Sequence, residues 1–300
     1  MIPAPMRQLY PFDGSFFRIG NHHLHYIDEG KGPPILMLHG NPTWSFYYRR
    51  AIRDLSSTHR VIVPDHIGCG LSDKPDDSEY EYTLARRVDD LERLLASLNL
   101  AEPLTLMVHD WGGVIGLAYA VRHPDKIVRI VLTNTAGFPL TPGRRLPVAL
   151  HVARAPVLGP LLVRGLNLFC RGATKHGVTR ARMPASVRAG YLWPYRSWSD
   201  RRAIHRFIQD IPVRGADKSF SILQEVATGL DSLRSKPRLI LWGGRDFVFD
   251  RFILERWRLQ WPDAVVKEFG DAGHYLFEDS WPECRDAIDE FLGYSRDKEE

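Results

Sequence analysis

The feature that most constrains the fold of this 300-residue chain is a regular alternation of short apolar runs with segments of helical spacing. β-Branched, apolar runs predict strands at 24–27, 35–38, 61–63, 104–108, 127–132, 239–242 and 264–269. Helical spacing predicts helices at 84–98, 114–121, 252–257 and 285–292. Strands that alternate with helices in this way predict an α/β fold with a mostly parallel sheet covered on both faces.

The residues that directly follow the predicted strands are where function is expected. In open parallel sheets the ligand binds beyond the carboxyl ends of the strands. Here the strand ends carry His-Gly-Asn-Pro at 39–42, Asp65 to Ser72, His-Asp-Trp-Gly-Gly at 109–113, Gly-Gly-Arg-Asp at 243–246 and Gly-Asp-Ala-Gly-His at 270–274. We interpret the 65–72 motif as a structural turn.

The motif at 109–113 stands where a strand turns sharply into a helix. It resembles the nucleophile elbow of the α/β-hydrolases, with Asp110 where most members carry serine. Asp110, Asp246 and His274 also follow that family's chain order of nucleophile, acid and histidine. The resemblance covers nearly the whole chain and implies an α/β-hydrolase fold with an eight-stranded, mostly parallel sheet and an inserted helical cap.

Within the superfamily the motifs look most like those of the haloalkane dehalogenases. The resemblance rests on Asn41 after the first His-Gly and on Asp110-Trp111 at the elbow. It implies that the Asn41 amide and the Trp111 indole bind a departing halide. A carboxylate is ionised at neutral pH and can displace a halide from carbon without a base. Hydrolysis of the resulting ester requires a base, which the resemblance assigns to His274, oriented by Asp246.

The acid of the triad is selected by elimination. In this family it follows either of two strands, but there is no Asp or Glu between Asp125 and Asp200, so the strand at 127–132 supplies none. Asp246 directly follows the next strand, and Asp250 is its competitor. An acid here together with the Asn–Trp pair resembles the third haloalkane dehalogenase subfamily.

Residues 138–213 fall between two predicted core strands, where these enzymes carry a helical cap. The expected division is therefore core at 1–137, cap at 138–213 and core again at 214–300. Five cap aromatic residues are candidates for the wall of an apolar pocket: Phe169, Trp193, Tyr195, Trp198 and Phe207.

Several functions share this skeleton. Hydrolytic dehalogenation is the leading interpretation, and the alternative is β-lactone decarboxylation to long-chain alkenes, because those enzymes resemble the same subfamily with the same five residues. An epoxide hydrolase would need two cap tyrosines, for which Tyr191 and Tyr195 are candidates. Fluoroacetate dehalogenases carry Arg at the position of Trp111, and serine esterases or peroxidases require Ser at position 110. A non-catalytic binding protein is least favoured because the triad is intact.

The charge of the chain is unevenly distributed. Residues 141–215 hold fourteen Lys or Arg against Asp200 and Asp210, a local balance of +12 in a chain of net charge +4. Such asymmetry suggests that the cap meets an acidic protein partner or a membrane surface. We expect a small apolar or long-chain substrate, no nucleic acid partner, no metal or organic cofactor and an oligomer as one option.

Cysteine usage and the first residues bear on location. Cys69, Cys170 and Cys284 are isolated thiols without metal-ligand spacing, and Pro11 and Asp13 interrupt the stretch where a signal peptide would be apolar. We therefore expect a cytoplasmic protein. Of the histidines, His22, His23 and His25 are expected on the surface of a strand.

Overall fold

The computed structural model describes residues 2–141 and 143–293, and its centre is one mixed sheet. Within these ranges eight strands pair in the order β1-β2-β4-β3-β5-β6-β7-β8. The strands are β1 (Ser15–Ile19), β2 (His22–Glu29), β3 (Pro34–Leu38), β4 (Arg60–Pro64), β5 (Leu104–His109), β6 (Ile127–Thr133), β7 (Arg238–Gly243) and β8 (Val265–Phe269). Only the β1–β2 and β2–β4 pairs are antiparallel, so β3 to β8 present their carboxyl ends at one edge.

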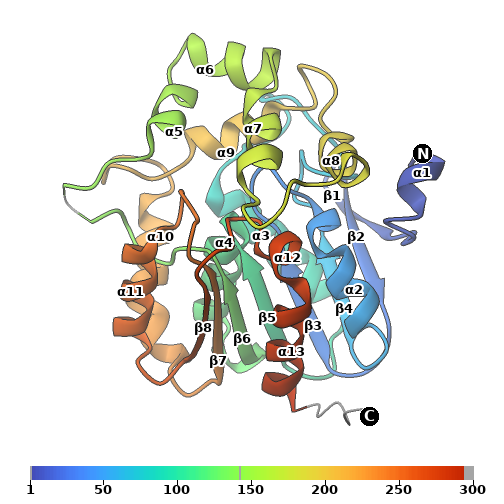
Figure 1. The fold of residues 1–300 in the computed structure, drawn as a ribbon, viewed down its shortest axis with the longest axis vertical. Helices are drawn as coiled ribbons and strands as arrows, with labels where there is room; N and C mark the ends of the chain where they lie inside the picture. The colour runs from blue at the N-terminus through green and yellow to red at the C-terminus, as the bar shows by residue number, and fades with distance from the viewer. Residues whose placement is uncertain (1, 142, 294–300) are drawn as a thin grey trace.

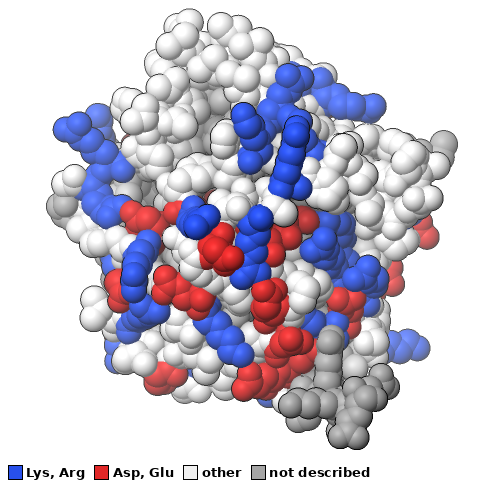
Figure 2. Space-filling model, in the orientation of Figure 1, with Lys and Arg blue, Asp and Glu red and all other residues white. Residues whose placement is uncertain are grey.

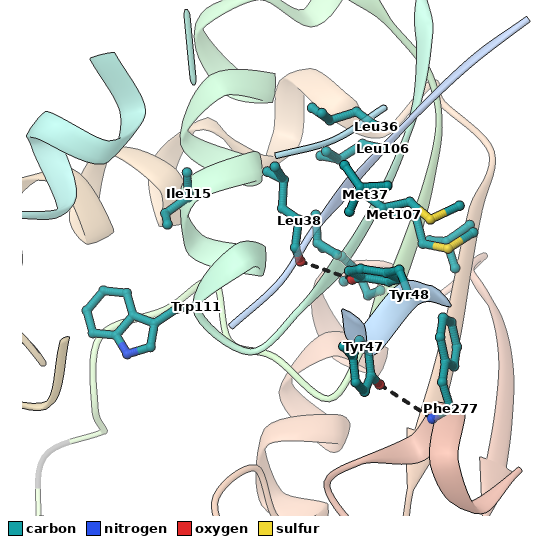
Figure 3. Packing of buried hydrophobic residues seen from close by; sticks show 14 of the residues in the cluster. Leu36, Met37, Leu38, Tyr47, Tyr48, Leu106, Met107, Trp111, Ile115 and Phe277 are labelled. Atoms are coloured by element: carbon teal, nitrogen blue, oxygen red, sulfur yellow. Dashed lines mark hydrogen bonds between the residues drawn. The ribbon is translucent and has the colours of Figure 1, made fainter. Parts of the chain in front are cut away.

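Helices cover both faces of the sheet (Figure 1). Helices α3 (Leu84–Ser97), α4 (Trp111–Arg122) and α10 (Phe220–Gly229) pack together on one face, whereas α2 (Arg49–Leu55) and α13 (Trp281–Leu292) lie on the other. The central strands β3 and β5 are buried along their whole length. Their apolar side chains pack as shown in Figure 3. Burial on both faces explains why these strands are mostly apolar rather than alternating.

The predicted strands and helices are present with small shifts at their ends. The α/β-hydrolase architecture with an eight-stranded sheet is confirmed. Sequence patterning missed β1, an edge strand whose residues are mostly exposed, and helices α2 and α10. The expectation that His25 lies on the surface is wrong: its side chain is buried and donates from Nδ1 to Asp65 Oδ2 at 2.9 Å.

A helical segment is inserted between β6 and β7 and lies above the carboxyl edge of the sheet (Figure 1). It contains α5 (Val148–Ala153), α6 (Leu158–Pro160), η3 (Leu161–Gly165), α7 (Leu168–His176), α8 (Ala185–Leu192) and α9 (Arg202–Gln209). We call residues 138–213 the cap; that it forms a domain of its own stays a prediction. No described helix has the length and apolar character needed to cross a bilayer.

A buried ion pair within the core accepts a hydrogen bond from the cap and so connects the two. Arg49 of α2 forms a bidentate ion pair with Glu278 of α12 (Leu276–Asp279), and both side chains are almost inaccessible to solvent. Tyr191 of the cap helix α8 donates from its hydroxyl to Glu278 Oε1 at 2.6 Å. Although burial alone would raise the pKa of Glu278, Arg49 and Tyr191 together lower it. The carboxylate therefore stays charged and holds cap and core together.

Replacement of Arg49 by Met should be strongly destabilising, because Glu278 would be left as a buried charge without a cation. We expect a loss of about 3–5 kcal/mol in the free energy of unfolding, measured by urea denaturation. Arg53→Met on the same helix is the matched control, because Arg53 is mostly exposed and its loss should change stability little. Equal effects of the two substitutions would contradict this account of the anchor.

Candidate active site

Asp110 occupies a sharp turn between β5 and α4. Its φ of 51° and ψ of −126° lie in a region that L-residues rarely adopt. The turn brings α4 so close to β3 that a Cβ at Gly112 would lie 2.0 Å from the main-chain oxygen of Leu38. Glycine is therefore required two residues after Asp110, and the elbow expected from the sequence is formed.

Two main-chain N–H groups face the Asp110 carboxylate. The Asn41 N–H donates to Oδ1 at 2.6 Å, and the N–H of Trp111 also contacts the carboxylate. Gly40 permits this approach, since a Cβ there would lie 2.1 Å from the same Oδ1. The other oxygen, Oδ2, faces Nε2 of His274 at 3.9 Å. Oδ1 is thus fixed by the Asn41 N–H, and Oδ2 is the oxygen that faces His274.

Burial raises the pKa of Asp110 to about 6 against the opposing effects of His274 and of the Asn41 and Trp111 N–H groups. The cause is the loss of hydration, which disfavours the charged carboxylate. A carboxylate in this state is a stronger nucleophile than one in water, because fewer donors stabilise its charge.

Asp246 and His274 form the second part of the site. Nδ1 of His274 donates to Asp246 Oδ2 at 2.7 Å, while Asp246 Oδ1 accepts from the N–H groups of Val248 and Phe249. Burial would lower the pKa of His274, but the nearby carboxylates of Asp246 and Asp110 outweigh it and raise that pKa. The imidazole therefore lies between two carboxylates, with its tautomer fixed by Asp246.

Asp250, the competitor for the place of Asp246, has another role. Its carboxylate caps α11 (Arg251–Gln260) by accepting from the N–H groups of Phe252 and Ile253. It also pairs with Arg144 of the cap. Since these contacts satisfy Asp250 at the helix N-terminus, the geometry favours Asp246 as the partner of His274.

The side chains of Asn41 and Trp111 both reach the cavity beside Asp110. Nδ2 of Asn41 donates to the main-chain oxygen of Ile204 at 3.1 Å, which uses one of its two hydrogens. The Trp111 ring packs against Phe207 at 5.3 Å and points away from the sheet core (Figure 3). Within residues 2–141 and 143–293, indole hydrogen bonds are made by Trp44, Trp257, Trp261 and Trp281 and none is made by Trp111. Both side chains can therefore offer an N–H to an anion.

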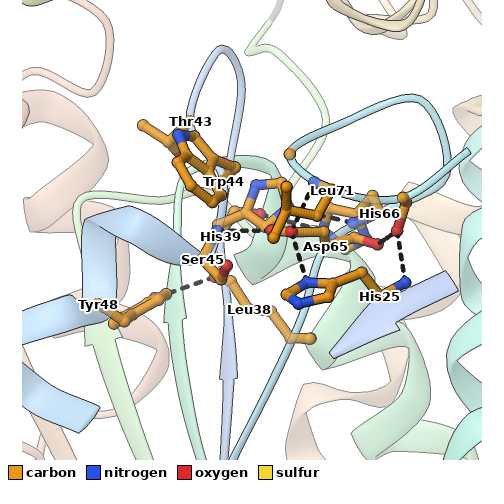
Figure 4. Close-up of polar contacts among 12 residues, drawn as sticks. His25, Leu38, His39, Thr43, Trp44, Ser45, Tyr48, Asp65, His66 and Leu71 are labelled. Carbon is orange, nitrogen blue, oxygen red and sulfur yellow. Dashed lines mark hydrogen bonds and ion pairs between the residues drawn. The ribbon is translucent and has the colours of Figure 1, made fainter. Parts of the chain in front are cut away.

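A buried polar cluster holds the loop that carries Asn41 (Figure 4). The Asp65 carboxylate accepts from the N–H groups of Ser45 and Leu71 and from Nδ1 of His25, at 2.7, 2.9 and 2.9 Å. These contacts overcome the effect of burial and lower the pKa of Asp65 to about 2. Asp65 is thus a permanent charge that fixes the start of the Ser45–Tyr48 turn (η1), and the 65–72 motif does not contact Asp110.

A cavity of about 940 Å³ opens above Asp110 between core and cap. Its lining is mostly apolar and includes Trp111. The polar side chains in it are Asn41, Asp110, Arg144, Arg145, His176, Asp250 and His274. Of the five cap aromatics expected to line it, Phe169 does so and Phe207 only supports Trp111 from behind. Trp193, Tyr195 and Trp198 are not in the lining, and sequence reasoning missed Phe138, Phe247 and Phe249, which follow β6 and β7.

The two tyrosines expected of an epoxide hydrolase lie elsewhere. Tyr191 donates to Glu278, and the Tyr195 hydroxyl donates to the main-chain oxygen of Thr43 at 3.0 Å. Neither lines the cavity. The cavity therefore lacks the two tyrosines, Tyr191 and Tyr195, that the epoxide hydrolase interpretation assigned to it.

In the described part of the chain, no three His, Cys, Asp or Glu side chains are grouped so that they could hold a metal ion. The three cysteines are buried and unpaired, and burial raises the pKa of each thiol.

Comparison with known proteins identifies relatives along almost the whole chain. Residues 33–280 match the model of the alpha/beta hydrolase fold family. A cis-3-alkyl-4-alkyloxetan-2-one decarboxylase of Shewanella oneidensis is 49% identical over 95% of this chain and 89% of its own length. Haloalkane dehalogenase 2 of Mycobacterium tuberculosis is 34% identical over 97% of this chain and 98% of its own length. The crystal structure of the haloalkane dehalogenase DatA from Agrobacterium tumefaciens shares the fold, with a TM-score of 0.83 and 24% sequence identity. The match covers 93% of this chain and 96% of that structure.

Substitution of Asp110 by Asn should stabilise the protein at neutral and alkaline pH. The folded-state pKa of about 6 lies above the ordinary value of 3.8, so ionisation of Asp110 destabilises the folded protein above pH 6. The penalty is absent below the ordinary value, where Asp110 is protonated in both states. We expect a gain of about 1–3 kcal/mol at pH 8 that disappears between pH 6 and pH 4, measured by urea unfolding.

The matched control is Asp125→Asn, an exposed aspartate beyond the other end of α4. It should show no such pH-dependent gain. A pH-independent effect of Asp110→Asn would contradict the raised pKa.

Proposed function

Since the chain belongs to the α/β-hydrolase family, in the group that includes the haloalkane dehalogenases and the β-lactone decarboxylases, we propose that it is a β-lactone decarboxylase. Its substrate would be an oxetan-2-one with alkyl chains at carbons 3 and 4, and its products an alkene and carbon dioxide. Sequence motifs put hydrolytic dehalogenation first. The identity of 49% to a decarboxylase against 34% to a dehalogenase favours the opposite order.

The observation that carries this proposal is a carboxylate nucleophile at the base of a cavity of about 940 Å³ with an apolar lining. Pockets for small ligands span roughly 300–1,000 Å³, so this cavity is at the upper end. A short haloalkane would leave most of it empty, whereas a lactone with two alkyl chains would fill it. Apolar walls also match a substrate whose polar atoms are confined to one ring.

In the first step Oδ2 of Asp110 attacks carbon 4 of the lactone. The bond from carbon 4 to the ring oxygen breaks, ring strain is released, and that oxygen becomes part of a free carboxylate on carbon 3. The products are an alkyl ester on Asp110 and a substrate carboxylate. Trp111 and Asn41 line the cavity, and their side-chain N–H groups are suited to receive this carboxylate.

In the second step the substrate carboxylate leaves as carbon dioxide. The electron pair of the broken carbon–carbon bond forms the double bond between carbons 3 and 4, and the Asp110 carboxylate departs with its bonding pair. Negative charge thereby moves from the substrate back to Asp110. There the Asn41 and Trp111 main-chain N–H groups face it, and the apolar cavity disfavours charge on the substrate.

The two steps consume no water, so His274 needs no base function in them. Its raised pKa favours a protonated imidazole held by Asp246. A positive charge 3.9 Å from Asp110 Oδ2 stabilises the carboxylate as it leaves carbon 4. The same histidine, when neutral, would activate water in a hydrolytic dehalogenase.

Hydrolytic dehalogenation is the second candidate, supported by the free indole N–H of Trp111 beside Asn41. These groups would bind a halide as they would bind a carboxylate. The ester on Asp110 would then be hydrolysed at its carboxyl carbon, and one Asp110 oxygen would come from water. Whether an oxygen atom from water enters the Asp110 carboxylate therefore distinguishes the two functions.

We expect the native protein to convert a cis-3,4-dialkyl oxetan-2-one into alkene in water enriched in oxygen-18 without labelling Asp110. Alkene is measured by gas chromatography, and the Asp110 peptide by mass spectrometry after turnover. Asp110→Ala should lower the rate by roughly a thousandfold or more, whereas the exposed Asp125→Ala should retain it. Heavy oxygen in the Asp110 peptide would show that water hydrolyses the ester and would contradict the decarboxylation steps. Bromide release from bromoalkanes without alkene from lactones would support dehalogenation instead.

Replacement of His274 by Ala should affect the two chemistries differently. With a bromoalkane, the ester on Asp110 should accumulate because no base activates water, and intact mass should increase by one alkyl group. With the lactone, turnover should slow without an accumulated adduct, because loss of carbon dioxide needs no base. His123→Ala, at the far end of α4, is the control; a stable lactone adduct in the His274 variant would contradict the water-free second step.

A further inference from the structure

The end of the cap farthest from the sheet carries a cluster of exposed apolar side chains, which we call the apex. Its members are Val148, Val157, Leu158, Leu161, Leu166, Leu168 and Trp198, each between 47% and 80% exposed. Helices α5, α6, η3 and α7 contact one another in the order of the chain. Arg164 of η3 donates from Nε to the main-chain oxygen of Trp198, and its guanidinium lies over the Trp198 ring. The apex is therefore one surface. Soluble proteins rarely expose so many large apolar groups together unless something covers them.

The inner side of the same segment faces the cavity. Leu150 and Ala153 of α5, Val163 of η3 and Leu168 and Phe169 of α7 line it. Leu168 of the apex is also 48% exposed and therefore lies at the rim of the cavity. Val157, Leu158 and Leu161 do not line the cavity and point to solvent. The segment is apolar on both sides, so packing against the core does not explain its outer side chains.

Cations flank the apex, and acidic groups are scarce near it. Arg171 lies one helical turn after Leu168, and Arg196 lies two residues before Trp198. Neither forms an ion pair with an acidic side chain in the part of the chain that the structure describes. Figure 2 shows blue side chains on both sides of an uncharged upper end, with the red side chains gathered over the sheet below. The apex thus combines apolar groups with unpaired positive charge.

From this combination we propose that the apex docks on the surface of an anionic phospholipid bilayer. The protruding apolar side chains enter the boundary between headgroups and acyl chains, while Arg171 and Arg196 face lipid phosphates. An acidic protein surface would pair with the cations but would leave the exposed Val157 and Leu161 without an apolar environment. Docking places one wall of the substrate cavity against the bilayer. The inference goes beyond the proposed reaction and does not depend on it.

Binding is tested by flotation of the purified full chain with vesicles of phosphatidylglycerol and phosphatidylcholine, compared with phosphatidylcholine alone. We expect binding to the anionic vesicles that weakens in about 1 M salt, where the screening length is about 3 Å. The apex variant Val157→Ser, Leu158→Ser, Leu161→Ser should lose binding while keeping turnover of a detergent-dispersed substrate. Arg171→Ser with Arg196→Ser should weaken it by roughly 25-fold, since each basic residue near an anionic surface contributes about fivefold.

The matched control replaces exposed apolar residues far from the cap. Val128→Ser, Leu259→Ser and Val265→Ser alter β6, α11 and β8 and should leave vesicle binding unchanged. Three results would overturn the proposal. They are no flotation of the native protein, salt-sensitive binding that persists in the apex variant, and dissociation of an oligomer by the apex substitutions in size-exclusion chromatography. The last would show that a second copy covers the apex.

Discussion

The strained turn at Asp110 is the constraint on which the site depends. A residue with φ of 51° at the end of β5 costs roughly 1–3 kcal/mol, and neighbouring elements hold it in place. Gly112 lets α4 pack against β3, and Gly40 lets the loop after β3 reach the carboxylate. The Asn41 N–H is consequently delivered to Oδ1 at 2.6 Å. Asp65, beneath that loop, is a second buried charge whose hydrogen bonds keep the donor in position.

Two buried carboxylates in one site differ because their hydrogen bonds differ. Asp246 accepts from two main-chain N–H groups and from His274, whereas burial dominates at Asp110 and raises its pKa to about 6. Two carboxylates in different environments can take different chemical roles. Asp246, the carboxylate with more hydrogen bonds, holds His274, and in the proposed reaction Asp110 is the nucleophile. This arrangement serves both lactone opening and halide displacement, so the chemistry is decided by the substrate that the cavity admits and by access of water.

Sequence patterning predicted the central strands and the site because both follow from local rules. Strands β3 to β7 are mostly apolar runs, interrupted by Thr105 in β5 and Arg129 in β6, and the polar residues that follow them meet at one edge in any parallel sheet. The misses have a different origin. β1 is an exposed edge strand without such a run. His25 is buried beside Asp65, forty residues away in the sequence, which accepts a hydrogen bond from its Nδ1. The cavity aromatics Phe138, Phe247 and Phe249 lie on loops, whose direction depends on packing between cap and core rather than on periodicity.

The charge pattern of the cap follows from what it covers. No acidic residue occurs between Asp125 and Asp200, the segment that forms most of the cavity roof. A carboxylate there would act on Asp110 through a medium of low dielectric constant and would raise its pKa further. Fewer nucleophiles would then be ionised at neutral pH. Excluding acids from the roof therefore favours catalysis, and it also leaves the outer surface positive. A surface that is both positive and apolar also fits the proposed docking on an anionic bilayer, so one constraint of charge bears on both sides of the cap.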